Sequence, residues 1–600
     1  MKKLVIAATL LILLQAGFAG YDEVVFNKNK ERREIVETIA GNEITGYLQQ
    51  AGYPILPYIA RVYEFPVGTK INVIVKAKDV EKRGGGRVKI AMPPKIDGFE
   101  NIELEYEIAD FEIYPSKWYD YSIGIGRNKQ GKIVEFLTIY LYPQRITKDG
   151  IMLHASSFDI NMKYDLPTQS FFNNDEYDLL IITPEKWIDE LQPLVQHKEQ
   201  HGIKTMVASV ENILSSSSGR DDAEKVKYFI KDALEQYGID YVLLIGGRKS
   251  GLKERWFMPV RYSHLDDGSN WEASYLCDLY FADIYKYEDG QPVFEDWDSN
   301  GNGVFAEWSF KGKDYLDLYP DVYVGRLACR NKAEVKIMVD KIITYENQPF
   351  QEFNKFILVA GDSYDDSHGY IEGELATWEA YKQLKGFEAV KVWASEIDLS
   401  SKNIINAMNG GAGFAYFCGH GNPMSWSTHE PYNFNEWEEG LQIFDMPLLK
   451  NGYKMPIVII GGCHNSQFNV TIFNSFDKEK MWRGENAPEC WSWWLTRKYG
   501  GGAIATIGNT GLGYHGDEDD NNDSIADYLQ VLDGWLEINF FRLYNEGIDM
   551  LGMLHAATLT GFINAFPGSE KMPLKDTIDV KVVQEWCLLG DPSLKIGGYK

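Results

Sequence analysis

Several features that would place the chain in a simple functional class are scarce or missing. Six cysteines among 600 residues are too few for a disulfide-stapled scaffold. No cluster of lysine and arginine occurs anywhere along the chain, and the formal net charge is −27. Both observations argue against a nucleic-acid partner. After the N-terminal apolar run, no stretch reaches the roughly 18 uncharged apolar residues of a membrane-spanning helix. The acidic surplus favours a solvated surface and is compatible with divalent-cation binding.

The first residues have the three parts of a secretory signal. Two lysines precede the apolar run Leu4 to Leu14, and the small residues Gly17 and Ala19 occupy the −3 and −1 positions of a cut after Ala19. We therefore expect residues 1–19 to be a signal peptide. The mature protein is expected to be secreted or periplasmic, with no membrane span after signal removal.

Strand and helix patterns divide the rest of the chain into three regions. Residues 20–172 contain short β-type runs between Gly, Pro and Asp turns, such as Ile133 to Leu141, and predict a β-sandwich-like domain. In residues 173–346 and again in 347–600, apolar strands alternate with helical segments, which predicts two tandem α/β subdomains. We expect open parallel sheets with helices on both faces. Nothing in the sequence predicts the oligomeric state.

Two apolar strands of the last region end in reactive side chains. The run FAYFCGHG delivers His420 followed by Gly421, and the run PIVIIGGC delivers Cys463 after two glycines. Ligands of open α/β sheets sit beyond the carboxyl ends of the strands, so imidazole and thiol meet there if these strands are neighbours. The pair suits acyl transfer, in which a thiolate attacks a carbonyl and the histidine moves the proton. The amides of Gly421 and Cys463 could then stabilise the developing oxyanion.

With these motifs the chain resembles the caspase-like cysteine peptidases and, among them, the gingipain family, also called C25-type. Further stretches carry the resemblance: LLIITPEKW, QHKEQHGIKTMV, YVLLIGG, DVYVGRLAC, HGNPMSW and LLGDPSL. The resemblance implies a caspase-like fold, cysteine endopeptidase activity on protein or peptide substrates, and a dyad of His420 and Cys463. It also implies a third, acidic member, for which Asp362 is the nearest match.

The same resemblance gives the N-terminal domain a role. Residues 52–71 resemble the family's N-terminal propeptide, and the junction at 167–175 is polar. We therefore expect a zymogen whose N-terminal domain covers the cleft until it is cut. The P1 preference, meaning the residue type before the scissile bond, is not predicted.

Other functions remain open at this stage. The chain could be a non-catalytic, calcium-stabilised protein that keeps the caspase-like scaffold for binding, or a transpeptidase that resolves the thioester with an amine. Cys463 and His464 could hold a metal, although no third ligand is near in the sequence. The remaining histidines are expected outside the chemistry: His197 and His201 on an exposed helix face, and His429 and His515 in surface loops.

A separate twelve-residue stretch, DWDSNGNGVFAE, fits the pattern of a calcium loop. Its expected ligands, counted from position 1 to position 12, are Asp296, Asp298, Asn300, the carbonyl of Asn302, and Glu307. The flanking sequence does not read as paired helices, so we expect a structural Ca²⁺ rather than an EF-hand sensor. A second acidic run at 516–524 lacks this spacing and is expected to be solvated or, at most, a weak cation site.

Overall fold

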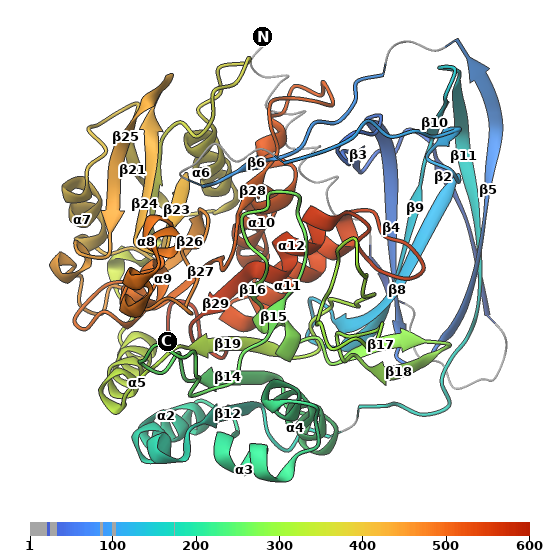
Figure 1. The fold of residues 1–600 in the computed structure, drawn as a ribbon. Helices are drawn as coiled ribbons and strands as arrows, with labels where there is room; N and C mark the ends of the chain where they lie inside the picture. Colours follow the sequence, from blue (N-terminus) through green and yellow to red (C-terminus); the bar gives the residue numbers. More distant parts are fainter. Residues whose placement is uncertain (1–20, 24–32, 85–87, 99–103, 173, 600) are drawn as a thin grey trace.

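The computed structural model describes residues 21–23, 33–84, 88–98, 104–172 and 174–599 (Figure 1). The expected signal peptide falls on residues that lie outside these ranges. No helix within the described ranges has the length and apolarity needed to cross a bilayer.

The N-terminal region is built from two five-stranded sheets. One sheet has the order β1 (Tyr21–Glu23), β4 (Leu56–Pro66), β9 (Ile133–Leu141), β8 (Tyr119–Arg127), with β3 (Gly46–Leu48) beside β4. The other has the order β2 (Arg33–Ala40), β11 (Met152–Asp165), β10 (Gln144–Thr147), β7 (Ile113–Tyr114), with β5 (Lys70–Arg83) beside β11. Side chains from both sheets form one apolar cluster that includes Ile59, Phe65, Leu137, Phe158 and Ile160. The expected β-sandwich-like domain is therefore present.

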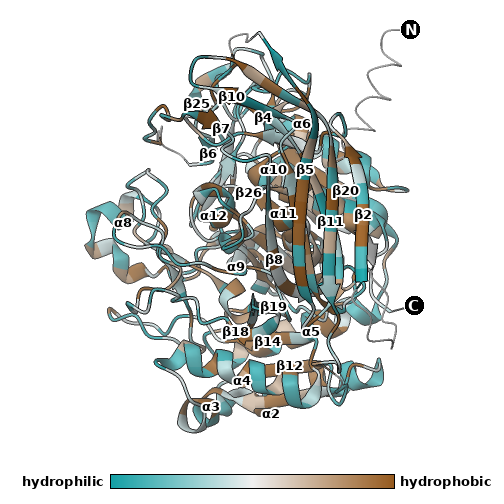
Figure 2. Ribbon diagram, turned by 90° about the vertical axis from the view of Figure 1, so that its right-hand side faces the viewer, coloured by the Kyte–Doolittle hydropathy of each residue, from teal (hydrophilic) through white to brown (hydrophobic). Residues whose placement is uncertain are grey.

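Figure 2 shows β5, β11 and β2 side by side along one side of the molecule, with hydrophilic and hydrophobic positions mixed along each strand. The burial of β11 alternates over much of its length, as expected for a sheet with one face in the core and one face toward solvent.

The first α/β unit has a four-stranded parallel sheet in the order β13 (Thr205–Ser209), β12 (Leu179–Thr183), β14 (Tyr241–Ile245), β19 (Tyr323–Leu327). Every residue of β12 and β19 is buried; β12 accordingly reads as an almost continuous apolar run, whereas β19 carries the buried Arg326. The helices of this unit are α2 (Ile188–Gln200), α3 (Val210–Ser216) and α4 (Asp222–Tyr237), and α5 (Lys332–Asn347) leads into the second unit.

The second α/β unit has a six-stranded sheet in the order β21 (Glu388–Trp393), β20 (Lys355–Ala360), β22 (Phe414–Cys418), β26 (Ile457–Gly461), β27 (Ala505–Asn509), β29 (Trp586–Leu589). All neighbours are parallel except β29, which runs antiparallel to β27. The strands β22, β26 and β27 are fully buried, so both faces of the sheet are covered. The expected α/β fold class is confirmed.

Helices of the second unit pack on the sheet in two sets. The helices α6 (Glu372–Gln383) and α10 (Leu532–Asn545) contact each other and lie against β20, β22 and β26. The helices α7 (Ser401–Asn409) and α9 (Trp491–Arg497) contact β20, β21, β27 and β29. Two further helices, α11 (Leu551–Ala565) and α12 (Thr577–Glu585), complete the unit.

One short strand connects the N-terminal region to the second α/β unit. The strand β6 (Lys95–Ile96) leaves the sandwich and pairs antiparallel with β28 (Tyr514–His515), as Figure 1 shows. Tyr58 of the sandwich also donates to the carbonyl oxygen of Ala565 at 2.9 Å. The N-terminal region is therefore packed onto the unit that carries His420 and Cys463.

Candidate active site

The strands that carry the two reactive groups are neighbours. In the parallel ladder of β22 and β26, Cys418 lies opposite Gly461. His420 and Cys463 each follow two residues after these positions. The two side chains therefore leave the sheet at the same edge, as the sequence predicted for adjacent strands.

Asn465 joins the segment that follows β26 to the segment that follows β22. Its side-chain amide donates to the carbonyl oxygens of Asn422 at 2.8 Å and Ser425 at 3.0 Å, which belong to the loop after His420. A Cβ on Gly421 would lie 2.1 Å from Oδ1 of Asn465, and one on Gly462 would lie 2.7 Å from it. The glycines beside the two reactive residues are thus required by this close approach.

His420 is buried and held in one orientation. Its Nε2 bonds to the carbonyl oxygen of Ser363 at 2.8 Å, which assigns the proton to Nε2 and leaves Nδ1 as the unprotonated nitrogen. Burial lowers the pKa of His420, although the charge of Asp97 and the backbone of Ser363 and Gly98 act in the opposite direction. The imidazole is therefore neutral near pH 7 and able to accept a proton at Nδ1.

The structure corrects the expected role of Asp362. Its carboxylate accepts from the backbone amide of Tyr432 at 2.7 Å, and within the described ranges no hydrogen bond joins it to His420. Asp362 lies two residues after the end of strand β20. The contact that orients the imidazole comes from the main chain of Ser363 instead.

Cys463 is a buried thiol in this conformation. Its Sγ accepts from the backbone amide of Gly513 at 3.1 Å, and the residue is 1% exposed. Burial raises the pKa of the thiol well above its usual value, and the charge of Asp97 adds to this, against the opposing effect of the Gly513 amide. All six cysteines are buried and unpaired. Neither Cys463 nor His464 belongs to a group of three metal-ligand side chains in the described part of the chain.

A segment of the N-terminal region lies on these groups. The carbonyl oxygen of Asp97 accepts from the amide of Gly421 at 3.1 Å and from the amide of Cys463 at 3.2 Å. The amide of Asp97 donates to the carbonyl oxygen of Gly513 at 3.0 Å, which continues the ladder of β6 and β28. The backbone of the following residue, Gly98, contacts the imidazole of His420 closely enough to affect its pKa. Residues 95–98 thus run through the site as an extended peptide would.

The side chain of Asp97 is enclosed by the second α/β unit. One carboxylate oxygen, Oδ1, accepts from the hydroxyl of Tyr364, and Oδ2 lies 2.7 Å from Nδ1 of His515. Asp97 and His515 are both fully buried. The expectation that His515 is a surface-loop residue is therefore wrong. No local pattern signals this pair, because 418 positions separate its members.

Other histidines also differ from expectation. The helix α2 does not expose His197, whose Nε2 lies 2.8 Å from Glu346. The neighbouring Lys198 is fully buried and pairs with Glu346 at 2.9 Å and with Asp591 at 2.8 Å. His429 is 6% exposed and its ring lies against Trp437. The ion pairs of Lys198 join α2 to α5 and to the C-terminal loop, so Lys198 has a structural role.

The predicted calcium loop has a different register from the one expected. The carboxylate of Asp298 accepts from the amides of Asn302 at 3.0 Å and Gly303 at 3.1 Å, the contacts that position 1 of such a loop makes. Gly303 has a φ of +81°, which suits the sharp turn at position 6. Arg220 pairs with both carboxylates, with Asp298 at 2.5 Å and with Asp296 at 3.2 Å. The loop therefore begins two residues later than the sequence pattern indicated.

Polar side chains of this loop still converge on Glu307, whose carboxylate accepts from amide nitrogens. Glu307 lies within 3.2 Å of the side-chain amide of Asn300 and within 2.6 Å of that of Asn302. Asp314, which the sequence pattern missed, accepts from the amides of Asn300 at 3.0 Å and Glu307 at 2.8 Å. Carboxylate and amide oxygens on a tight turn fit the ligand preference of Ca²⁺.

The second acidic run is not a free solvated segment. Asp519 accepts from the amides of Asp523 at 3.0 Å and Ser524 at 2.9 Å, in the pattern seen at Asp298. The same run holds the N-terminal region through two ion pairs, Lys89 to Asp520 at 2.6 Å and Lys95 to Asp517 at 3.3 Å.

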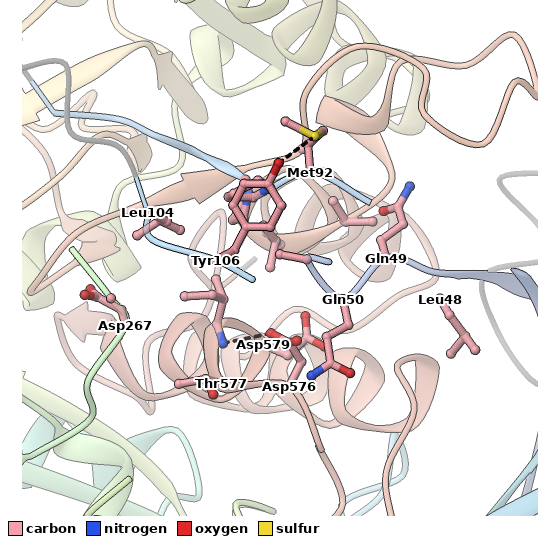
Figure 3. A pocket seen from close by; sticks show the side chains of 18 of the residues that line it. Leu48, Gln49, Gln50, Met92, Leu104, Tyr106, Asp267, Asp576, Thr577 and Asp579 are labelled. Atoms are coloured by element: carbon pink, nitrogen blue, oxygen red, sulfur yellow. Dashed lines mark hydrogen bonds between the residues drawn. The ribbon is translucent and has the colours of Figure 1, made fainter. Parts of the chain in front are cut away.

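A large cavity lies between the N-terminal region and the second α/β unit, away from the two reactive residues. It has a volume of about 1040 Å³. Figure 3 shows Gln50, Met92 and Tyr106 from the N-terminal region facing Asp576 and Asp579. The interface between the two parts is therefore incompletely packed.

Comparison with known proteins identifies the family. A family model described as Peptidase family C25 matches residues 172–597. Gingipain R2 of Porphyromonas gingivalis is 25% identical over 306 residues, which cover 49% of this chain and 33% of that protein. Lys-gingipain of the same organism is 24% identical over 252 residues, which cover 39% of this chain and 13% of that protein. The chain thus spans a third or less of the length of these gingipains.

Two further comparisons are more distant or purely structural. An uncharacterized protein of Archaeoglobus fulgidus is 23% identical over 370 residues, which cover 58% of this chain and 79% of that protein. The crystal structure of the Arg-specific cysteine proteinase gingipain R matches at a TM-score of 0.44 with 18% identity, covering 71% of this chain and 80% of that one. The family model spans both strands that carry the reactive residues and most of the chain. The chain therefore belongs to peptidase family C25.

Proposed function

We propose that the protein is a cysteine endopeptidase in which Cys463 is the nucleophile and His420 the acid and base. One observation carries the proposal: the amides of Gly421 and Cys463 donate to a single peptide carbonyl oxygen, that of Asp97. The imidazole of His420 and the thiol of Cys463 follow the neighbouring strands β22 and β26. Two converging amides beside a thiol and an unprotonated imidazole nitrogen are the parts that acyl transfer requires.

The first half of the reaction forms a thioester. The thiol of Cys463 gives its proton to Nδ1 of His420, and Sγ attacks the carbonyl carbon of the substrate. The oxygen that becomes negative is held by the amides of Gly421 and Cys463, each supplying on the order of 3 kcal/mol of transition-state stabilisation. His420 then passes the proton to the departing amine as the peptide C–N bond breaks.

The second half releases the product. A water molecule gives a proton to His420 and its oxygen attacks the thioester carbonyl, again with the oxyanion at the same two amides. The C–S bond breaks, the thiol recovers its proton, and a carboxylic acid leaves. The carbonyl of Ser363 keeps the imidazole in one tautomer through both halves, because it accepts from Nε2.

The N-terminal region keeps this site latent in the proposed zymogen. Residues 95–98 fill the place of a substrate, and the thiol beneath them has a pKa raised by burial. A substrate can enter only after this segment has been displaced or cut. The incomplete packing around the large cavity supports a domain that can separate from the catalytic unit.

We further propose a structural Ca²⁺ in the loop that begins at Asp298, with Asn300, Asn302 and Glu307 as the other ligands. The ion would neutralise carboxylates that lie close together and fix the loop. The signal-like N-terminus supports an exported protein, secreted or periplasmic.

Cleavage of a P1-diverse peptide library tests the proposed activity. We expect the full chain, after the N-terminal region has been released, to cleave the library, and the variant Cys463→Ala to lose this activity. Retained cleavage in Cys463→Ala would contradict the assignment. If both proteins bind peptides and cleave none, the chain is a binding scaffold. Mass spectrometry with an added amine distinguishes hydrolysis from transpeptidation, because an amine-capped product appears only in the second case.

A further inference from the structure

The position of Asp97 identifies the specificity pocket of the site. In a cysteine peptidase, the carbonyl oxygen held by the two amides belongs to the P1 residue, the one before the scissile bond. Here that oxygen belongs to Asp97. The side chain of Asp97 therefore occupies the pocket that a P1 side chain enters.

The main chain around Asp97 is held as a substrate would be. The amide of Asp97 donates to Gly513 at 3.0 Å, and Ile96 and Lys95 pair with Tyr514 and His515 in the antiparallel ladder. Addition of an extended peptide to a strand edge is a common recognition mode, in which the backbone supplies affinity and alternate side chains supply specificity. Ile96 is 6% exposed, and Lys95 pairs with Asp517 at 3.3 Å.

The pocket around the carboxylate contains donors that match an acidic group. His515 reaches Oδ2 at 2.7 Å and Tyr364 donates to Oδ1, so both carboxylate oxygens are bonded. Burial alone would lower the pKa of His515, but the charges of Asp97 and Glu537 and the hydrogen bonds to them raise it well above its usual value. The imidazole is therefore protonated, and its Nδ1 donates to the carboxylate of Asp97.

The pocket is fixed by groups that do not touch the substrate side chain. The ring of Tyr528 stacks on His515 with centroids 4.0 Å apart, and Nε2 of His515 lies 3.4 Å from Glu537. Burial raises the pKa of Asp533 to about 8, so this neighbouring carboxyl is neutral near pH 7 and does not repel a second carboxylate.

The pocket is also short. A Cβ on Gly513 would lie 3.0 Å from Oδ2 of Asp97, which shows how closely the loop approaches the end of the side chain. A glutamate side chain, one methylene longer, would push its carboxylate into this loop or into His515. Arginine and lysine would bury a cation against a protonated imidazole, which is unfavourable.

From this geometry we propose that the enzyme cleaves after aspartate, with His515 and Tyr364 as the residues that recognise the P1 carboxylate. Residues 95–97 then act as an internal copy of the preferred substrate, and the Asp97–Gly98 bond lies in the position of the scissile bond. This inference rests on the proposed peptidase function and adds its substrate class.

A set of matched covalent probes tests the inference. Tripeptidyl acyloxymethyl ketones of sequence Lys-Ile-Xaa, with Xaa as Asp, Asn, Glu, Arg or Lys, are incubated with the full-chain variant Asp97→Ala, in which the pocket is vacated. Labelling of Cys463 is followed by peptide mapping. We expect the aspartyl probe to label Cys463 at least tenfold faster than the asparaginyl probe, the factor that loss of one charge-assisted hydrogen bond gives.

The results distinguish a wrong P1 specificity from a wrong peptidase function. Fastest labelling by the arginyl or lysyl probe, or equal rates for Asp and Asn, would overturn the specificity and leave the peptidase intact. Because the main chain of residues 95–98 can still cover the site in uncut Asp97→Ala, a failure of every probe is scored after limited proteolysis in the segment 84–103. Failure of every probe there, while iodoacetamide modifies Cys463, would overturn the peptidase function and the specificity together. If iodoacetamide does not react, the protein is first nicked by limited proteolysis in the segment 84–103, and the same criteria apply.

Two pocket variants extend the test. In the Asp97→Ala background, Tyr364→Phe and His515→Gln should each slow aspartyl labelling at least tenfold more than they slow iodoacetamide labelling of Cys463 in the same protein. Tyr364→Phe removes one hydroxyl and is the milder change if His515→Gln impairs folding. Unchanged aspartyl labelling in Tyr364→Phe would remove Tyr364 from the pocket and, together with equal Asp and Asn rates, end the proposal.

Discussion

The backbone amides of Gly421 and Cys463 point at the same oxygen, at 3.1 and 3.2 Å, although they come from different strands of the sheet. That oxygen belongs to Asp97, in a segment of the N-terminal region. A pair of donors this well placed around a peptide carbonyl explains how the site could stabilise an oxyanion and how the N-terminal region could block it. The predictions below separate these two roles.

Adding a methyl group to Gly421 should damage the oxyanion donors. The Cβ of Gly421→Ala would lie 2.1 Å from Asn465, so the loop must move and its amide leaves the carbonyl oxygen. We expect kcat to fall about a hundredfold, the usual cost of one lost donor, with a smaller change in KM. Gly410→Ala, in the same α/β unit, is the control, because Gly410 has a helical φ of −66° and an added Cβ would come no closer than 3.1 Å to another atom of the described residues. A normal kcat in Gly421→Ala would remove this amide from the reaction.

Replacing Asp97 by asparagine should loosen the segment that covers the site. Asparagine is nearly isosteric and keeps the carbonyl contacts, but it loses the charge that pairs with His515 at 2.7 Å. A buried charge left without its partner costs about 3 kcal/mol or more. We expect iodoacetamide to modify Cys463 at least tenfold faster in Asp97→Asn than in the wild type. Cys418, also fully buried, serves as the internal control and should react slowly in both proteins.

The same ion pair should make latency depend on pH. The pKa of His515 is raised in the folded protein, so its stabilising effect is complete below the unfolded pKa of about 6.5 and is lost as pH rises through the folded value. The groups that face the imidazole are Asp97, Asp533, Glu537, Tyr528 and Cys418. We expect the difference in Tm between wild type and Asp97→Asn to be largest near pH 6 and to shrink toward pH 10. A difference that grows with pH would contradict a protonated His515.

Calcium removal should reveal which register the loop uses. EDTA should lower Tm, because an ion that binds only the folded state stabilises it by about 2.7 kcal/mol at one hundred times its Kd. Asp298→Ala should abolish the response to calcium, since Asp298 takes position 1. Asp296→Ala should keep it, since the amides of Asn302 and Gly303 donate to Asp298 and not to Asp296. The reverse result would restore the register read from the sequence.

The candidate site was only partly predictable from the sequence, and the reason differs between its parts. His420 and Cys463 each end a continuous apolar strand next to glycine, a local signal that fixes where the side chain emerges. The partners Asp97 and His515 give no such signal, because their contact forms only when the N-terminal region folds onto the second α/β unit. The role of Asp362 was misplaced because sequence cannot show whether a side chain or the next carbonyl faces the imidazole.

The calcium loop illustrates a different limit. In DWDSNGNG, the pattern of alternating oxygen ligands followed by glycine fits two registers that differ by two residues. Only the backbone hydrogen bonds, which run from Asn302 and Gly303 to Asp298, distinguish them. Arg220, far away in the sequence, pairs with the carboxylates of both Asp296 and Asp298 and so does not distinguish the registers.

Trapping the acyl-enzyme tests the central claim most directly. The variant Asp97→Ala is mixed with an ester of Lys-Ile-Asp, quenched in acid after a short interval, and digested for mass spectrometry. The account predicts the mass of the Lys-Ile-Asp acyl group on the peptide that carries Cys463, and no adduct in Asp97→Ala combined with Cys463→Ala. An acyl group on another residue, or ester hydrolysis that persists in the double variant, would contradict it.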